Sequence, residues 1–296
     1  MRDAFRENAA AFFGNFLKLL SFFLAPIFAI GLFSAPIKFD AAFLQNFANL
    51  ENVSAESFVV FDLKSGETLA ERAPDRPHAV ASLTKLMTTL LIFENHAPSE
   101  IVEISAPAIF QTPPVKMNLQ FEEKITLQNL LRGLLISSAN DAAVAVAIFD
   151  SKSVEHFVAK MNRRARQLNL QNTKFKNPHG LDAWGHFSTA REIAILASFL
   201  LQKKFEKWDD FFTQTIDAPH FTVFSQNGKI AHELKNTNLL LQNPRIFGIK
   251  TGTTVLAGQC LAILARDATR EILIVVLGSQ KRFDDAQILV RKFLQN

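Results

Sequence analysis

The chain has 296 residues, of which 48% are apolar and 20% are charged, a length and composition that allow a large buried core and exclude a disordered chain. The formal net charge is +4 without a block of like charges, which falls short of the basic surface of a nucleic-acid-binding protein, so no nucleic-acid partner is expected. The only cysteine is Cys260 and the seven histidines are scattered, so an internal disulfide is excluded and neither a metal nor a cofactor is predicted.

Residues 1–35 have the features of an export signal. Basic residues precede an apolar run from Leu19 to Ala35, which matches the charged region and hydrophobic core of such a signal. The run is also near the lower limit of about 17–25 residues for a membrane-spanning helix, so an uncleaved N-terminal membrane anchor is the alternative. Residues 36–50 are interpreted as a linker, and the domain after it is expected in the periplasm or on the outer face of the cytoplasmic membrane.

Residues 51–296 are expected to form one domain that opens with a β-hairpin. A strand at 57–62 and a shorter one at 68–71 flank the turn-forming residues 64–67. A helix is then predicted to begin near Ser82 and continue to Phe93, because apolar residues recur there at helical spacing.

The middle of the chain is predicted to be helical. Thr126 is expected to be the N-cap of a helix over 127–135. The nearly continuous apolar run 141–149 is expected to form the next helix, so that 138–140 makes a tight connection between the two. Amphipathic patterns predict two further helices, at 153–168 and 189–201.

The end of the chain changes to the two-residue period of strands. A hairpin turns at Asn227-Gly228. The remaining predicted elements are the hairpin strands 221–224 and 229–233, the strands 247–253, 258–265 and 271–277, and a closing helix at 284–294. Strands at both ends and helices between them predict an α+β fold, in which an antiparallel sheet flanked by helices carries an inserted all-helical lobe.

Three short motifs follow one another along the chain. They are Ser82-Leu83-Thr84-Lys85, Ser138-Ala139-Asn140 and Lys250-Thr251-Gly252, a set typical of the serine acylation sites of penicillin-binding proteins and serine β-lactamases. On a helix, residues three apart share a face, so the amine of Lys85 would lie beside the Ser82 hydroxyl that it must deprotonate. Two other tripeptides, at 64–66 and 225–227, are similar to the third and second motifs, but they lie in sequence typical of turns.

Longer blocks extend this pattern over about residues 50–295. They are residues 81–88, 137–143, 161–162, 177–181, 188–191, 248–254 and 276–279 with 282–283. In these blocks the chain resembles the low-molecular-mass penicillin-binding proteins of the D-alanyl-D-alanine carboxypeptidase and endopeptidase kind. It departs from them at Val80, where proline is usual, and no β-rich domain of the kind that some relatives add is expected.

The resemblance implies a penicillin-binding, β-lactamase-like fold and a serine D,D-peptidase activity on peptidoglycan stem peptides. Ser82 would form the acyl-enzyme, also with β-lactams, while Ser138 and Asn140 would orient the base Lys85 and pass a proton to the leaving nitrogen. Burial and the charge of Lys250 are expected to make Lys85 neutral enough to act as a base. The expected substrate-binding residues are Lys250, Thr251, Gly252, Thr253 and Arg282, and the expected oxyanion hole consists of the backbone N–H groups of Ser82 and Thr253.

Several alternatives are weighed against this interpretation. An endopeptidase that cuts D,D cross-links has the same motifs, and the compact length slightly favours it. A β-lactamase is less favoured, because the only glutamate between residues 140 and 180 is Glu155, whereas class A enzymes use a glutamate for deacylation. A catalytically silent wall-binding protein is also less favoured, because such a protein would not need the intact motifs. His179 is interpreted as loop structure, and Cys260 as a buried apolar residue.

Overall fold

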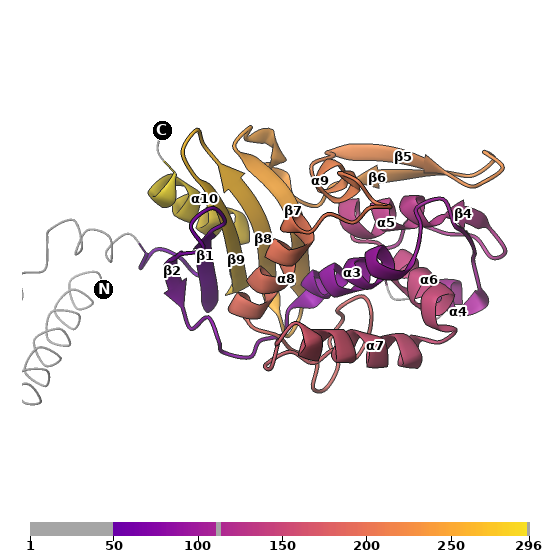
Figure 1. Ribbon diagram of the computed structural model, residues 1–296, viewed down its shortest axis with the longest axis horizontal. Helices are drawn as coiled ribbons and strands as arrows, with labels where there is room; N and C mark the ends of the chain where they lie inside the picture. The colour runs from indigo at the N-terminus through magenta and orange to yellow at the C-terminus, as the bar shows by residue number, and fades with distance from the viewer. Residues whose placement is uncertain (1–49, 111–113, 295–296) are drawn as a thin grey trace, which may run out of the picture. The chain divides into compact units, whose positions relative to one another are not determined.

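The computed structural model describes residues 50–110 and 114–294, and its central element is a five-stranded antiparallel sheet of order β2-β1-β9-β8-β7 (Figure 1). The strands are β1 (Ser57–Asp62), β2 (Thr68–Arg72), β7 (Ile246–Thr254), β8 (Gly258–Arg266) and β9 (Glu271–Ser279). β1 pairs with β9 from Ser57 opposite Leu277 to Asp62 opposite Ile272. The N-terminal hairpin thus joins the last three strands, as the sequence predicted, and the α+β fold class is confirmed.

Helices cover both faces of this sheet. Successive side chains of a strand point to opposite faces, so Phe58 and Val60 join one hydrophobic cluster and Val59 joins the other. The first cluster is completed by α10 (Arg282–Phe293) and the second by α8 (Ala190–Gln202). Each fully buried side chain of this size contributes roughly 1.5–3 kcal/mol, so the two clusters fix the sheet between its helices.

A helical lobe lies on the side of α8 that faces away from the sheet, and α3 is at its centre (Figure 1). Its main helices are α3 (Lys85–Asn95), α5 (Leu127–Ile136), α6 (Asn140–Ser151) and α7 (Val154–Gln167). Every residue of α3 from Lys85 to Phe93 is buried. The inserted lobe is therefore built around α3, and the predicted helices at 127–135, 141–149, 153–168 and 189–201 are confirmed to within two residues at each end.

Several short elements went unpredicted. They are β3 (Ile101–Glu103), α4 (Ala106–Phe110), β4 (Lys124–Thr126), α9 (Phe211–Ile216) and the 3-10 helix η2 (Leu239–Gln242). Elements of three to six residues are too short to show a hydrophobic period. The second ribbon, β5 (His220–Phe224) with β6 (Ala231–Lys235), was predicted from its turn.

The segment around Ser82 differs from the single helix predicted for it. Residues Ala81–Thr84 form a 3-10 helix, η1, and the α-helix begins only at Lys85. The chain enters η1 through Ala81 at φ +47°, a left-handed conformation that an α-helix cannot contain. Ser82 therefore lies on a tight turn, partly exposed, ahead of the buried helix.

Thr126 occupies the predicted N-cap position of α5, but its hydroxyl does not cap the helix. The first N–H groups of α5 instead donate to the carbonyl oxygens of Glu100 and Pro98. Thr126 Oγ1 is buried and has no hydrogen-bond partner in the described part of the chain. At α8, by contrast, the hydroxyl of Thr189 accepts a hydrogen bond from the N–H of Glu192.

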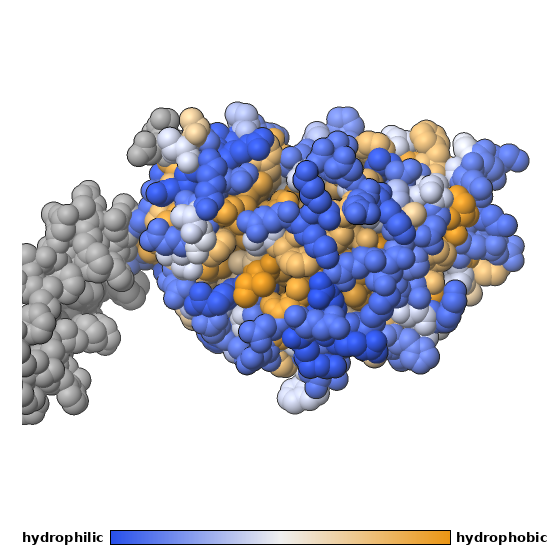
Figure 2. Space-filling view, viewed as in Figure 1, coloured by the Kyte–Doolittle hydropathy of each residue, from blue (hydrophilic) through white to orange (hydrophobic). Residues whose placement is uncertain are grey.

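The predicted export signal at residues 1–35, and all but the last residue of the predicted linker at 36–50, lie outside the described residues. Within residues 50–110 and 114–294, no helix has the length and hydropathy needed to cross a membrane. The face of the protein in Figure 2 is mostly hydrophilic, with apolar residues exposed in patches. An apolar hollow of about 390 Å³ lies between α8 and the strands β1 and β2.

The two threonines provide a test of helix capping. Thr189→Val is expected to lower the free energy of unfolding by about 1 kcal/mol, because the Glu192 N–H loses its acceptor. Thr126→Val removes a buried hydroxyl without a partner, so it is expected to be neutral or to stabilise by up to about 1 kcal/mol. Urea unfolding followed by circular dichroism measures both changes. Equal destabilisation by the two substitutions would contradict this assignment.

Candidate active site

The residues of the three motifs meet where the helical lobe adjoins the edge strand β7. Lys85 Nζ lies 3.0 Å from Ser82 Oγ and 2.7 Å from Asn140 Oδ1. Gly252 of β7 packs so closely on η1 that a Cβ atom there would lie 2.8 Å from the backbone nitrogen of Ser82. Segments that are 55 and more residues apart in sequence therefore form one site.

The amine of Lys85 is enclosed by protein. The residue is 0% exposed, and Nζ contacts a third acceptor, the backbone carbonyl oxygen of His179, at 2.9 Å. Burial, and after it the positive charge of Lys250, hold the pKa of Lys85 well below its ordinary value, although Asp141 acts in the opposite direction. The amine is therefore biased toward its neutral form.

The three contacts also determine where the lone pair of a neutral amine points. A neutral amine has two N–H bonds and one lone pair. The oxygens of His179 and Asn140 can only accept, so they take the two N–H bonds, and the lone pair is left facing the Ser82 hydroxyl. Asn140 Nδ2 donates to the Pro114 carbonyl at 2.6 Å, which fixes the amide with Oδ1 toward Lys85. This geometry allows Lys85 to receive the proton of Ser82.

The loop at 177–181 supplies the carbonyl group of His179. Thr88 Oγ1 donates to the Pro178 carbonyl at 2.7 Å, and the N–H of Gly180 donates to Asn177 Oδ1 at 2.6 Å. Burial, followed by the charge of Lys85, lowers the pKa of the His179 imidazole to about 3, so the ring is neutral. His179 thus contributes backbone rather than imidazole, a role without a side-chain signal in the sequence.

Sequence reasoning also missed His186, which supports η1. The Lys176 N–H donates to His186 Nδ1 at 3.2 Å. The ring proton must therefore be on Nε2, which lies 2.8 Å from Thr84 Oγ1 and donates to it. Burial lowers the pKa of His186 to about 4, consistent with this neutral tautomer.

The β7 residues line the opposite side of the site. Lys250 is 2% exposed, and burial, followed by the charge of Arg282, lowers its pKa to about 7. The hydroxyl of Thr251 lies 2.6 Å from that of Thr237, a residue the sequence did not single out. Arg282 Nη1 donates to the Gly252 carbonyl at 2.8 Å and to Thr253 Oγ1 at 2.5 Å.

The remaining candidates are placed as follows. Ser138 is buried beside Asn140 and has a left-handed backbone, with φ +62°. Cys260 is fully buried, and burial raises the pKa of its thiol to about 11, so it packs as an apolar residue, as predicted. The two similar tripeptides, at 64–66 and 225–227, lie in the loops that connect β1 to β2 and β5 to β6.

Solved structures that match this fold include a penicillin-binding protein and a DD-transpeptidase. The Streptomyces K15 DD-transpeptidase matches with a TM-score of 0.75 and 26% identity, over 81% of this chain and 97% of that one. Penicillin-binding protein 6B from Escherichia coli matches with a TM-score of 0.73 and 31% identity, over 83% of this chain and 78% of that one. Fold and site together define a member of the penicillin-binding class.

The chain belongs to the D-alanyl-D-alanine carboxypeptidase family, whose model matches residues 44–281. It is 35% identical over 238 residues to the carboxypeptidase DacF of Bacillus subtilis, over 76% of this chain and 57% of the relative. It is 32% identical to the carboxypeptidase DacC of Escherichia coli, over 81% and 61%. The chain thus spans about three fifths of these relatives. A D-alanyl-D-alanine endopeptidase of Pseudomonas aeruginosa is 28% identical, over 81% and 77%.

Gly180 provides a test of how the 177–181 loop seats on η1. Its φ is +91°, and a Cβ atom there would lie 1.9 Å from the Ala81 carbonyl oxygen, whereas Gly66 has φ +76° and open space around it. Alanine costs about 1–2 kcal/mol at either left-handed position. Gly180→Ala is expected to lose a further 1–3 kcal/mol or so through the collision. Urea unfolding of both variants measures the difference, and equal losses would show that the close contact is unimportant.

Proposed function

We propose that this chain is a serine D,D-peptidase that removes the terminal D-alanine from peptidoglycan stem peptides, a D-Ala-D-Ala carboxypeptidase that β-lactams also acylate. The observation that carries the proposal is the buried amine of Lys85, held between two pure acceptors with its third contact on Ser82 Oγ. Membership of the carboxypeptidase family supports the same substrate.

The proposed reaction begins when Ser82 Oγ attacks the carbonyl carbon between the two D-alanine residues. The hydroxyl proton passes to Lys85, a C–O bond forms, and the peptide C–N bond breaks as the leaving nitrogen takes up a proton. Asn140 holds Lys85 through its amide oxygen, and Ser138 passes the proton toward the leaving nitrogen. A water molecule then attacks the acyl carbon and gives a proton to Lys85; the ester C–O bond to Ser82 breaks, and Lys85 returns the proton to Ser82 Oγ.

The remaining site residues bind the substrate in this scheme. The backbone N–H groups of Ser82 and Thr253 stabilise the negative oxygen of the tetrahedral intermediate. Lys250, Thr251 and Arg282 bind the carboxylate of the terminal D-alanine, and the close packing of Gly252 on η1 holds β7 at the right distance.

The proposed organisation follows from the sequence and the nature of the substrate. Residues 1–35 export the chain or anchor it in the membrane. Residues 36–50 form a linker, and residues 51–296 form the peptidase domain. The site of action is the periplasm or the outer face of the cytoplasmic membrane. Peptidoglycan is the macromolecular partner, and the N-terminal segment provides any membrane association.

Cleavage of D,D cross-links is the second candidate function. The similarity to the Pseudomonas endopeptidase favours it, and the scissile bond again follows a D-configured residue, so the acyl half of the substrate is shared. Rapid β-lactam hydrolysis is disfavoured, since Glu155 is exposed in the first turn of α7, and the hydrogen-bond partners of Lys85 Nζ are Ser82, Asn140 and His179.

Covalent labelling tests the site assignment. A fluorescent β-lactam is expected to acylate Ser82, because its strained carbonyl resembles the scissile amide, and Ser82→Ala is expected to abolish labelling. Lys85→Ala should slow acylation by about 10²–10⁴-fold through loss of the base. Labelling is followed by gel fluorescence, and the modified residue is located by peptide mass spectrometry.

The turn residues Lys64 and Ser65 provide matched controls for this experiment. They are the first two residues of Lys64-Ser65-Gly66, a tripeptide similar to Lys250-Thr251-Gly252, and Ser65→Ala and Lys64→Ala should leave the labelling rate unchanged. Label on any serine other than Ser82, or full labelling of Ser82→Ala, would mean that the nucleophile has been misassigned.

Muropeptide digestion separates the two candidate activities. Purified enzyme should release D-alanine from pentapeptides, and Lys250→Ala should raise KM for them, because the carboxylate loses its cation. An endopeptidase would instead convert cross-linked dimers to monomers with little free D-alanine. Mass spectrometry of the products distinguishes these outcomes. Stable β-lactam labelling without cleavage of either substrate would overturn the peptidase proposal.

A further inference from the structure

A polar pair, His232 and Glu123, is buried outside the motifs. His232 is 4% and Glu123 5% exposed, and His232 Nε2 lies 2.7 Å from Glu123 Oε1. On β6, exposed and buried residues alternate, and the inward positions are His232 and Leu234. A polar ring at a position suited to an apolar side chain costs free energy unless it is fully hydrogen-bonded.

The pair holds the segment of residues 114–123, which we call the strap. His232 Nδ1 lies 2.9 Å from the Met117 carbonyl oxygen, and Glu123 Oε2 accepts a hydrogen bond from the Gln120 N–H at 3.0 Å. The strap has three non-glycine residues with left-handed backbone, at Val115, Asn118 and Glu122. Such conformations cost about 1–2 kcal/mol each and persist only where surrounding contacts hold them.

The other edge of the strap is fastened to the first turn of α6. The side-chain oxygens of Asp141 accept hydrogen bonds from the N–H groups of Met117 and Leu119, at 3.0 and 3.2 Å. The backbone N–H of Asn140 donates to the Val115 carbonyl at 2.8 Å, and its Nδ2 donates to the Pro114 carbonyl at 2.6 Å. The strap thus determines which way the Asn140 amide faces.

We propose that His232 and Glu123 are positioning residues for acylation, which hold the strap so that the Pro114 carbonyl keeps Asn140 Oδ1 on Lys85. Neither side chain touches the reacting atoms. The proposal rests on the function proposed above. It adds a set of contacts that hold the base Lys85 in position through Asn140. If the strap shifts, the Asn140 amide is free to rotate, and Lys85 loses an acceptor.

The geometry also requires a proton between the two side chains. The Met117 carbonyl can only accept, so Nδ1 carries a proton, and one more must lie between Nε2 and Glu123 Oε1. The charged groups facing the ring are Glu123 and Asp141. Burial opposes protonation, but the hydrogen bond and charge of Glu123 outweigh it, so the pKa of His232 is raised. The contact is therefore complete below that pKa and is lost as pH rises through it.

Four variants of the full chain test the proposal. His232→Ala and Glu123→Ala are expected to slow β-lactam acylation of Ser82 by about 10²-fold, the effect of misplacing a catalytic group by roughly 1 Å. Glu123→Gln should retain most of the rate, because the amide N–H can donate to a neutral Nε2. Each rate is measured where thermal unfolding shows the variant to be folded.

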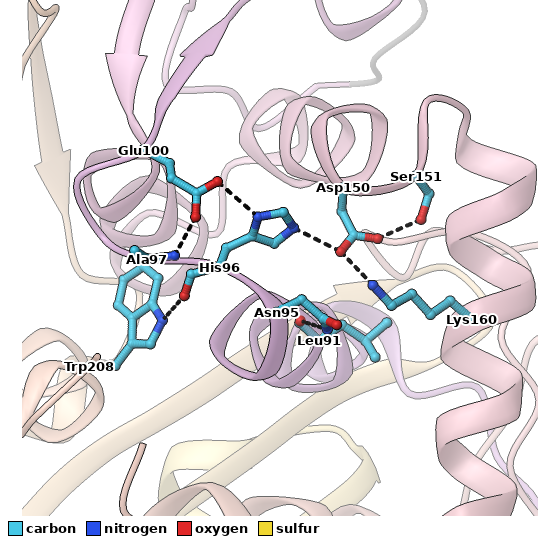
Figure 3. A network of polar contacts seen from close by, with 9 residues as sticks. All are labelled: Leu91, Asn95, His96, Ala97, Glu100, Asp150, Ser151, Lys160 and Trp208. Atoms are coloured by element: carbon cyan, nitrogen blue, oxygen red, sulfur yellow. Dashed lines mark hydrogen bonds and ion pairs between the residues drawn. The ribbon is translucent and has the colours of Figure 1, made fainter. Parts of the chain in front are cut away.

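His96→Ala is the fourth variant and the matched control. His96 also uses both ring nitrogens, lying 3.1 Å from Glu100 Oε2 and 3.0 Å from Asp150 Oδ1, and Lys160 contacts the same Asp150 oxygen (Figure 3). It lies at the opposite end of α3 from Lys85, about 16 Å along the helix axis at 1.5 Å per residue. His96→Ala should therefore destabilise the protein without slowing acylation. Equal slowing by His96→Ala and His232→Ala would overturn the proposal.

Hydrogen exchange gives a readout that does not depend on activity. In the native protein, exchange of the Met117 and Leu119 amides, corrected for intrinsic rates, should rise at alkaline pH as the shared proton is lost. In Glu123→Gln this rise should be absent, because the amide supplies the hydrogen. An identical pH profile in the two proteins would refute the positioning role even if β-lactams do not label Ser82. Conversely, absent labelling with the expected exchange would refute the proposed function alone.

Discussion

The site depends on the exclusion of water from one amine. A charged ammonium in a protein interior costs several kcal/mol unless it is paired, and the contacts of Lys85 are a hydroxyl and two carbonyl oxygens, none of which carries a full negative charge. The surrounding elements therefore do not simply hold Lys85 in place. By denying the ammonium water and a carboxylate contact, they lower its pKa.

This constraint explains why the site draws on segments that are far apart in the sequence. Four segments enclose the amine: η1, the 177–181 loop, the start of α6 and the edge of β7. Several adopt conformations that are unfavourable in isolation, with positive φ at Ala81 and Ser138. The well-packed helices and sheet behind them are what keep these backbones in place. The stability of the core and the chemistry of the site are thus connected.

The amine of Lys250 is also buried, and its pKa is also lowered. Lys250 extends from a strand, and its positive neighbours are Lys85 and Arg282. Because like charges disfavour one another's charged forms in a poorly screened interior, each lowers the pKa of the next. An anion bound between them would relieve this repulsion. Such an anion would therefore raise the pKa of Lys250.

The sequence by itself determined the elements with a long hydrophobic period, the pairing of the first hairpin with the last strands, and the side chains gathered around Ser82. Those features depend on residue type and spacing, which are visible in a linear chain. The sequence also predicts the export signal at 1–35, which stays a prediction.

The tertiary structure alone decided that Ser82 lies on a 3-10 turn and that Thr126 does not cap its helix. It also introduced partners that have no motif: the carbonyl of His179, the hydroxyl of Thr237 and the His232–Glu123 pair. A backbone carbonyl is present at every residue, so its use leaves no mark in the sequence. Glu123 and His232 are 109 positions apart, so their contact is not visible in the sequence either. Only the folded chain sets which groups are buried together, and burial determines which of them are charged.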